Sequence, residues 1–529
     1  MYKRGRKEQQ ISMDDPFMNI PKSIVENLRK SWAEDFYNDI FLSINEDRFS
    51  MLYSPQYSRP NKPVNILVSL LILKELHSLT DDQLMGSLYF DYRYQYALGI
   101  SDFEKESICI NTITNFRQRL VEHESKTQED LLKQETDALS QKLAEVIQLD
   151  KSMARMDSFM FSSSCKKLTR LELVYKVVQY MVKGLNKLDA VFVPEVFQDY
   201  LKEEHLNQTL YHTKSEEVGS KLDYQIEQAA TLYRYAVQHP EWREMNEFQH
   251  LSRLLNEQCI ETEEGVAIAI DAKHISPESL QNPSDPDATY RNKGGKGHVG
   301  LSVNLVEVRD QQKKVGLILS HDVRKNTHSD AAFGESFIQN DPLAAQIKTL
   351  AADGAYYRQS TLEEAKGKDI ELNLSNMTGR KAAKETLPVQ QFERNDKRLI
   401  VKCPAGHEPI RATYEASKQL YTAKFSKDLC LTCPFREQCP MKEQQKYNNV
   451  RFTESKLQSD SMRSSMGTDR HRELSRFRAG VEGVVSALRR GFRIDDLPVR
   501  GLLRSKIWIH AKILAYNFKS VTKYRARTA

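Results

Sequence analysis

The order of strand-like and helix-like segments from residue 152 onwards most constrains the fold of the chain. In chain order there is a strand at 152–164, a hairpin-like pair of strands at 298–308 and 314–320, a helix at about 330–340, an apolar strand ending at Asp353, and a strand at 370–376. A strand and a hairpin followed by a helix and further strands predict a mixed α/β sheet with an antiparallel section.

Long helical segments and a polar, cysteine-containing region separate these core segments. A chain of 529 residues is long enough for roughly three or four domains. We expect a helical N-terminal unit, an α/β core in three pieces, an all-helical insert and a Cys-rich insert. Their ranges are 1–145 for the N-terminal unit, 146–165 with 265–378 and 461–529 for the core, 166–264 for the helical insert, and 379–460 for the Cys-rich insert.

Composition narrows the class of protein. Hydrophobic residues make up 40% and charged residues 28%, as in ordinary globular chains. The net charge of +5, from 77 basic and 72 acidic residues, permits nucleic-acid binding only through local basic clusters. No apolar stretch approaches the roughly 20 residues of a membrane span, and the charged N-terminus shows no secretory signal. We therefore expect a cytoplasmic protein with no membrane partner.

Short helices dominate the N-terminal unit. Residues 80–83 have the pattern of a capping box at the start of a helix. A further helix at 111–120 carries Arg117 and Arg119. This pattern is compatible with a helix-turn-helix whose arginines bind DNA. It is equally compatible with a helical bundle that has a solvated basic face.

Three acidic residues lie on regular elements. Asp157 is in a short strand, Asp353 directly follows an apolar strand, and Glu482 lies on a basic, amphipathic helix predicted over 471–492. Phosphoryl transfer on nucleic acids commonly uses two divalent metals, and Mg²⁺ (or Mn²⁺) prefers oxygen ligands. Any one of these acids alone would more often be a cap or a turn residue, but together they predict a divalent-metal site.

Basic residues accompany these acids. Arg478 precedes Glu482 by four residues and shares its helix face, and Arg489 follows it by seven. This pattern fits a surface where DNA phosphate meets a metal, although a salt-bridged helix would look the same. The turn-rich loop at 279–300 adds three residues that could contact phosphates, namely Arg291, Lys293 and Lys296.

Four of the seven cysteines are concentrated in the Cys-rich insert. They are Cys403, Cys430, Cys433 and Cys439. The Cys-x2-Cys spacing matches half of a tetrahedral structural Zn²⁺ site, which two more thiolates would complete, and His407 could replace one of them. The alternative is a small subdomain with reduced, unligated thiols.

Taken in order, seven parts of the chain resemble the DDE transposases of bacterial insertion sequences, and most closely the eleven-eighty-two group with its helical N-terminal transposase domain. The matching strings are DDQLMGSLYFDYRYQYALGI with NTITNFRQRL, RMDSFMFSSSCKKLTRLEL, SLQNPSDPDATYRNKGGKGHVG, NTHSD, LAADGAYY, CPAGH with CLTCPFREQC, and RFRAGVEGVVSALRRG. The resemblance implies a ribonuclease-H-like core.

The resemblance also implies a catalytic triad of Asp157, Asp353 and Glu482 that holds two Mg²⁺. One alternative stays open, because VAIAIDA is the better strand by composition and ends in Asp271. If the helical stretch lies before the first core strand, Asp271 is the first carboxylate.

Many related transposases carry a Tyr–Arg–Glu–Lys signature around the catalytic Glu. Here Arg478 and Glu482 match it, Ser475 stands at the Tyr position, and Arg489 keeps the positive charge at the Lys position. The loss of Tyr puts the separate role of that residue in doubt.

The function implied by the resemblance is that of a transposase in the bacterial cytoplasm, associated with the nucleoid. It would bind the terminal inverted repeats of its element in double-stranded DNA and catalyse Mg-dependent strand cleavage and strand transfer. It would act as a homodimer or a larger synaptic complex, since two ends must be joined. The alternatives are a metal-dependent nuclease without strand transfer and a catalytically inactive DNA-binding derivative.

Overall fold

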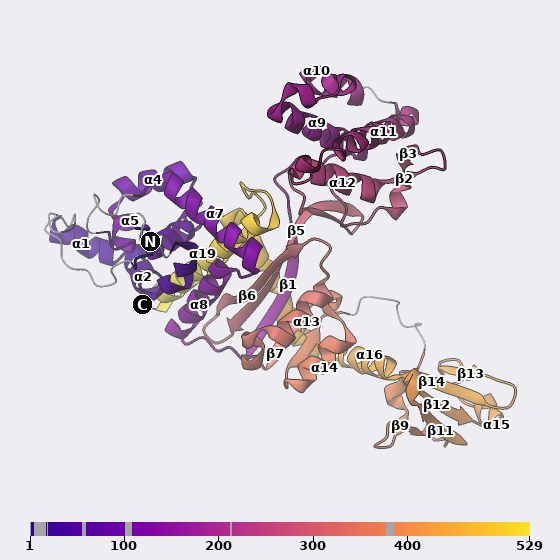
Figure 1. Cartoon of the computed structure of the whole chain (residues 1–529). Coiled ribbons are helices and arrows are strands. Elements are labelled where there is room, and N and C mark those ends of the chain that lie inside the picture. Colours follow the sequence, from indigo (N-terminus) through magenta and orange to yellow (C-terminus); the bar gives the residue numbers. More distant parts are fainter. Residues whose placement is uncertain are drawn as a thin grey trace.

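A central sheet with three attached units makes up the computed structural model of the chain (Figure 1). It describes residues 2–4, 17, 20–54, 60–100, 108–211, 214–376 and 386–528. N-terminal helices pack on one side of the sheet, a helical insert extends from the ends of β1 and β5, and a small β-rich unit projects beyond α16 (Figure 1).

The central sheet is mixed, as the sequence predicts. Its strands are β1 (Met153–Ser162), β4 (Thr289–Lys293), β5 (Lys296–Asp310), β6 (Val315–Lys325), β7 (Thr349–Ala352) and β8 (Glu371–Leu374). Five of these strands lie in the order β6-β5-β1-β7-β8, and β4 pairs with the first residues of β5. β5 runs antiparallel to β1 and β6, whereas β7 runs parallel to β1 and β8.

Helices cover both faces of this sheet. They are α13 (Asp330–Asn340), α14 (Gln359–Gly367), α17 (Asp469–Ala479), α18 (Val481–Phe492) and α19 (Leu502–Thr528). Successive strand residues point to opposite faces, and β1 illustrates this. Ser158 bonds to Asp330 of α13, whereas Arg155 bonds to the Phe477 carbonyl of α17. The segment 471–492, predicted as one helix, is two helices that meet at Gly480.

The N-terminal helices are α1 (Lys22–Arg29), α2 (Trp32–Asp39), α3 (Val64–Leu76), α4 (Asp81–Phe90), α5 (Tyr92–Ala97), α7 (Ile110–Thr127) and α8 (Leu131–Val146). All of them except α1 contribute to one hydrophobic core that they share with the sheet and α19. The predicted capping box is confirmed, since Thr80 and Gln83 exchange both side-chain bonds. The C-terminal end of α19 lies among these helices (Figure 1), where Arg525 pairs with Asp35 and Asp39.

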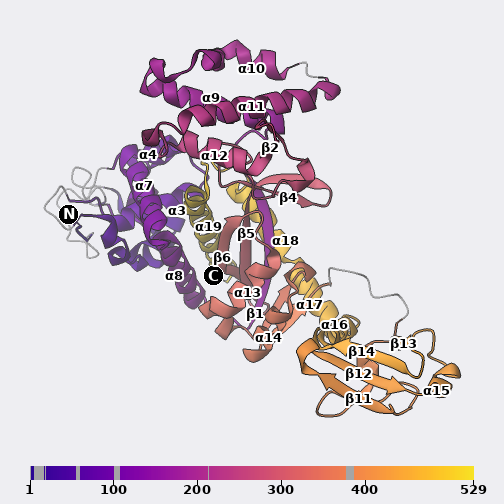
Figure 2. The same ribbon diagram turned by 45° about the vertical axis from the view of Figure 1, so that its right-hand side comes forward.

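The other two units have hydrophobic cores of their own. The helical insert contains α9 (Arg170–Leu188), α10 (Glu203–Leu210), α11 (Val218–Ala236), α12 (Asn246–Gln258), β2 (Cys259–Glu261) and β3 (Ala267–Ala269). The Cys-rich unit contains β9 (Glu393–Arg394), β10 (Ile400–Lys402), β11 (Arg411–Glu415), β12 (Leu420–Phe425), α15 (Lys427–Leu431), β13 (Met441–Glu443) and β14 (Asn448–Thr453). From it, α16 (Glu454–Ser465) leads through α17 to α18 (Figure 2). None of the described helices is both long and apolar enough to cross a membrane.

Candidate active site

Two of the three predicted carboxylates come together because β1 and β7 are parallel neighbours. Arg155 of β1 is in register with Ala351 of β7. Asp157 and Asp353 each follow this pair by two residues, and they lie near enough for the charge of Asp353 to act on Asp157. The third carboxylate, Glu482, lies in the first turn of α18, and this helix packs against β1.

One guanidinium group lies among all three carboxylates. Nη2 of Arg478 is 3.1 Å from Asp157 Oδ1 and 3.8 Å from Asp353 Oδ2. Nη1 is 3.5 Å from Glu482 Oε1, the i,i+4 pair that helical spacing predicts. The Arg478 side chain is 14% exposed and that of Glu482 71%, so the site opens to solvent on the Glu482 side.

Asp157 and Asp353 differ in their hydrogen bonds and in the charges around them. Burial raises the pKa of Asp157, an effect that Arg478 opposes and the charge of Asp353 reinforces. The Ser158 amide donates to Asp157 Oδ1 at 3.0 Å. Asp353 caps the turn that follows β7 and accepts a 2.6 Å bond from the Gly354 amide. A Cβ at Gly354 would overlap Asn376, which explains the glycine after this aspartate.

Carboxylate oxygens that converge on one cation are a suitable donor set for Mg²⁺. In the described part of the chain, however, no group of three or more His, Cys, Asp or Glu side chains is close enough to hold a metal ion as it stands. The donors therefore fit the metal chemically, while the position between them is taken by the Arg478 guanidinium.

The hairpin formed by β4 and β5 brings positive charge near Asp157. Lys293 and Lys296 face each other across its Gly294–Gly295 tip. The charge of Lys293 lowers the pKa of Asp157, against the larger effect of burial. Arg291, in contrast, lies 3.3 Å from the buried carboxylate of Asp330, so its guanidinium is engaged within the protein.

Arg489 holds α18 against β1. Its Nη2 donates to the Met160 carbonyl at 3.0 Å, and its guanidinium lies 5.5 Å from the centre of the Phe159 ring. The side chain remains 43% exposed. Part of this cation is therefore accessible to solvent.

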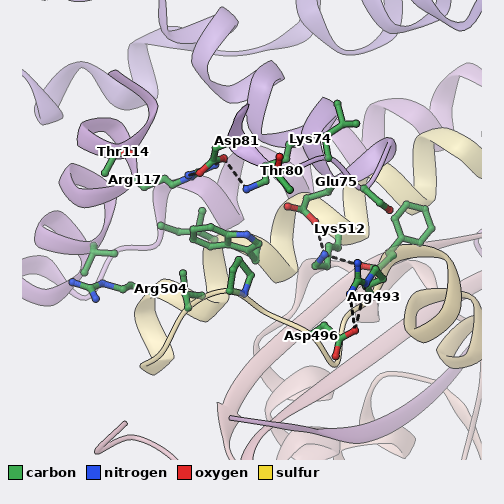
Figure 3. A pocket seen from close by; sticks show the side chains of 18 of the residues that line it. Lys74, Glu75, Thr80, Asp81, Thr114, Arg117, Arg493, Asp496, Arg504 and Lys512 are labelled. Carbon is green, nitrogen blue, oxygen red and sulfur yellow. Dashed lines mark hydrogen bonds and ion pairs between the residues drawn. The ribbon is translucent and has the colours of Figure 1, made fainter. Parts of the chain in front are cut away.

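The two arginines of α7 lie in different surroundings, away from the carboxylates. Arg117 is buried, forms two 2.9 Å bonds with Asp81, and lies over the Trp508 ring (Figure 3). These groups line a cavity of about 650 Å³ between α3, α4, α7 and α19. Arg119 is exposed and lies 4.8 Å from the centre of the Tyr53 ring.

The alternative carboxylate, Asp271, is outside the central sheet. The strand predicted before it is β3, which pairs only with β2 in the helical insert. Asp271 caps the following turn and its side chain accepts from the Lys273 amide, which lowers the pKa of Asp271. The structure thus brings Asp157, and not Asp271, to Asp353 and Glu482.

The four clustered cysteines line one apolar cavity of about 30 Å³ in the Cys-rich unit, together with His407. Burial, reinforced by the neighbouring thiols, raises the pKa of Cys439. All seven cysteines lie among the described residues, and none forms a disulfide.

Sequence reasoning missed two buried charges near Asp157, one on each face of β1. Asp330 accepts a 2.7 Å bond from Ser158 Oγ as well as contacting Arg291. Arg155 precedes Asp157 by two residues and lies on the same face of β1. The strand period of two could have indicated Arg155, because a charge on the inner face of a strand needs a partner.

Two models of known protein families match parts of the chain. A family model described as "Transposase DDE domain" matches residues 402–522, and one described as "Transposase domain (DUF772)" matches residues 26–119. The first range contains Arg478 and Glu482 but neither Asp157 nor Asp353. No curated protein and no solved structure matches significantly.

The match to a transposase DDE domain supports a DNA-transposition enzyme in general. More particularly, the two matches indicate a DDE transposase of an insertion sequence.

Proposed function

We propose that this chain binds the terminal inverted repeats of its insertion sequence and catalyses divalent-metal-dependent DNA strand cleavage and strand transfer. The observation that carries the proposal is the contact of one guanidinium, from Arg478, with carboxylates from β1, the end of β7 and α18. The strand order β6-β5-β1-β7-β8, with three antiparallel and then two parallel strands, supports a ribonuclease-H-like core.

In this proposal Asp157, Asp353 and Glu482 hold Mg²⁺ (or Mn²⁺). The chemistry that such ions supply when bound is activation of an attacking oxygen and stabilisation of the leaving oxygen. The chain itself brings the three carboxylates together and excludes water from the Asp157 side. Arg478 offsets their mutual repulsion, and its charge can be shared with a DNA phosphate.

DNA is proposed to lie across the exposed side of Glu482. Lys293 and Lys296 at the hairpin tip and the accessible part of Arg489 would contact its phosphates. The eleven-eighty-two group, nucleoid association and a dimeric or larger synaptic complex remain parts of the proposal that follow from the resemblance.

Single carboxylate variants test the proposal. Asp157→Asn, Asp353→Asn and Glu482→Gln should each lower Mg²⁺-dependent cleavage of element-end DNA at least about 100-fold, because each removes metal-binding charge. Asp271→Asn is the matched control and should cleave like wild type. Full activity of Asp157→Asn, or loss in Asp271→Asn, would overturn the assignment.

A second assay separates the transposase from a simple nuclease. A pre-cut element end carrying a free 3′-hydroxyl is offered with target DNA and Mg²⁺. Joined products are expected from a transposase. Cleavage without joining would indicate the nuclease, and neither reaction, with intact end binding, would indicate an inactive derivative.

We also propose a structural Zn²⁺ held by Cys403, Cys430, Cys433 and Cys439. Thiols are the donor type of such sites and these four line one cavity, but among the described residues they are not close enough to hold a metal ion as they stand, so binding would have to draw them together. Metal analysis of the purified protein should find about one zinc per chain. Cys430→Ser should lose it, whereas Cys165→Ser, outside the cavity, should not. Zinc-free wild-type protein would contradict this part.

A further inference from the structure

A buried ion pair lies directly beneath the carboxylates. Arg155 of β1 and Glu307 of β5 face each other across the antiparallel pair, with Arg155 Nε 2.5 Å from Glu307 Oε2. Their side chains are 6% and 1% exposed. Burial raises the pKa of Glu307, against the lowering effect of Arg155, so this pair lies in a poorly solvated part of the core.

The guanidinium of Arg155 also reaches the junction between α17 and α18. Its Nη1 donates to the Phe477 carbonyl at 2.8 Å, and its Cζ lies 5.3 Å from the centre of the Phe477 ring. Gly480, where the two helices meet, packs so closely on Arg155 that an added Cβ would overlap Nη1. A carbonyl in the last turn of a helix is a favourable acceptor for a cation.

The cost of burial indicates what this pair does. The free-energy cost of taking two charges out of water offsets most of their mutual attraction. Proteins in which well-packed apolar residues replace a buried ion pair are therefore often equally stable. Stability therefore does not explain the pair, whereas its place does. Arg155 is two residues before Asp157, and the junction it contacts lies between Arg478 and Glu482.

We propose that Arg155, held by Glu307, is a positioning residue for the candidate active site. It fixes where the α17–α18 junction meets β1, and so brings Arg478 and Glu482 to Asp157. Arg155 does not itself touch DNA or metal. The inference rests on the proposed function and adds to it the device that aligns the helix-borne and strand-borne carboxylates.

The test replaces the whole pair, so that no charge is left buried alone. The variant is Arg155→Met with Glu307→Leu. The control is Arg48→Met with Glu135→Leu, which removes an Arg–Glu pair of the N-terminal helices whose atoms lie 2.9 Å apart. Both variants should fold, and both should bind element-end DNA within about threefold of wild type, since neither pair is on the proposed DNA surface.

Single-turnover cleavage at saturating DNA then separates the two variants. We expect about a 100-fold loss for the Arg155–Glu307 variant, as for misplacement of reacting groups by about 1 Å, and little change for the control. Arg155→Lys, with Glu307 unchanged, should also cleave slowly. An ammonium group lacks the planar fork that reaches both Glu307 and the Phe477 carbonyl. Near-wild-type cleavage by the folded double variant would overturn the inference.

Hydrogen exchange provides a readout that needs no activity. Amides of residues 477–485 should exchange faster in the Arg155–Glu307 variant than in wild type or the control. Unchanged exchange in the Arg155–Glu307 variant would overturn the inference. Inactivity of the wild-type protein, in contrast, would refute only the proposed function. If the double variant fails to fold, Gly480→Ala can be used instead. Its added Cβ would overlap the Arg155 guanidinium, and it should give both slower cleavage and faster exchange.

Discussion

Arg478 places one positive charge among three negative ones, and this has two opposite consequences. Three carboxylates that contact one guanidinium would repel each other without that counter-charge. The guanidinium supplies that charge, with its side chain 14% exposed. It also lies where the proposed divalent cation would have to bind, so under that proposal Arg478 and the metal would compete for the same oxygens.

We therefore expect Arg478→Gln to bind Mn²⁺ more tightly than wild type in the absence of DNA, by about tenfold, or 1.4 kcal/mol. The same variant should cleave element ends poorly, because the charge that would meet a DNA phosphate is gone. Calorimetry and a cleavage assay measure the two effects.

Arg472→Gln is the matched control for this prediction, because Arg472 is an exposed arginine of the same helix that pairs with Asp469. The Mn²⁺ affinity and the cleavage rate of Arg472→Gln should both stay near wild type. Weaker Mn²⁺ binding in Arg478→Gln would show that Arg478 assists the metal site and does not compete with it.

At the scale of elements, β6, α8 and α19 meet around two buried histidines. His321 Nε2 lies 2.6 Å from His510 Nδ1, and His510 Nε2 lies 2.8 Å from Asp130 Oδ2. His321 Nδ1 is 3.5 Å from Asp137 Oδ1. Burial, helped by the charges of Lys133 and His510, holds the pKa of His321 well below its ordinary 6.5.

This depressed pKa predicts a loss of stability in mild acid. His321 stays neutral in the folded chain, whereas the unfolded chain binds its proton below pH 6.5, so unfolding takes up a proton there. The free energy of unfolding should fall by about 1.4 kcal/mol per pH unit from this group below pH 6.5, and not above it. Urea titrations of wild type and His321→Gln measure it, and equal slopes for the two would contradict the prediction.

At the scale of the whole molecule, the last helix, α19, joins the N-terminal helices to the central sheet. Asn517 bonds to the backbone of Ile318 in β6 and to Ser140 in α8. The N-terminal helices, the sheet and α19 form one hydrophobic core, whereas the helical insert and the Cys-rich unit each have their own. Cooperative unfolding follows shared cores.

We expect three unfolding units in native-state hydrogen exchange. Amides of α3, β5 and α19 should open with one common free energy, although α3 and β5 are far apart in sequence. Amides of α9 with α11, and of β12 with β14, should each open at a free energy of their own. Different values for α3 and β5 would show that the N-terminal helices unfold separately.

The sequence by itself determined what depends on near neighbours. The strand and helix order, the capping box at Thr80, and the shared face of Arg478 and Glu482 all follow from periodicity or from side chains within four residues. These signals were enough to indicate the mixed sheet and the three carboxylates.

Only the tertiary structure decided what depends on partners distant in the chain. It placed Asp157 beside Asp353 and left Asp271 in the insert, because strand pairing is not encoded in one strand. It engaged Arg117 with Asp81, 36 residues away. It also ended α17 at Gly480, where the Arg155 guanidinium fills the space that a side chain would need. Such choices come from packing and burial, which no local pattern contains.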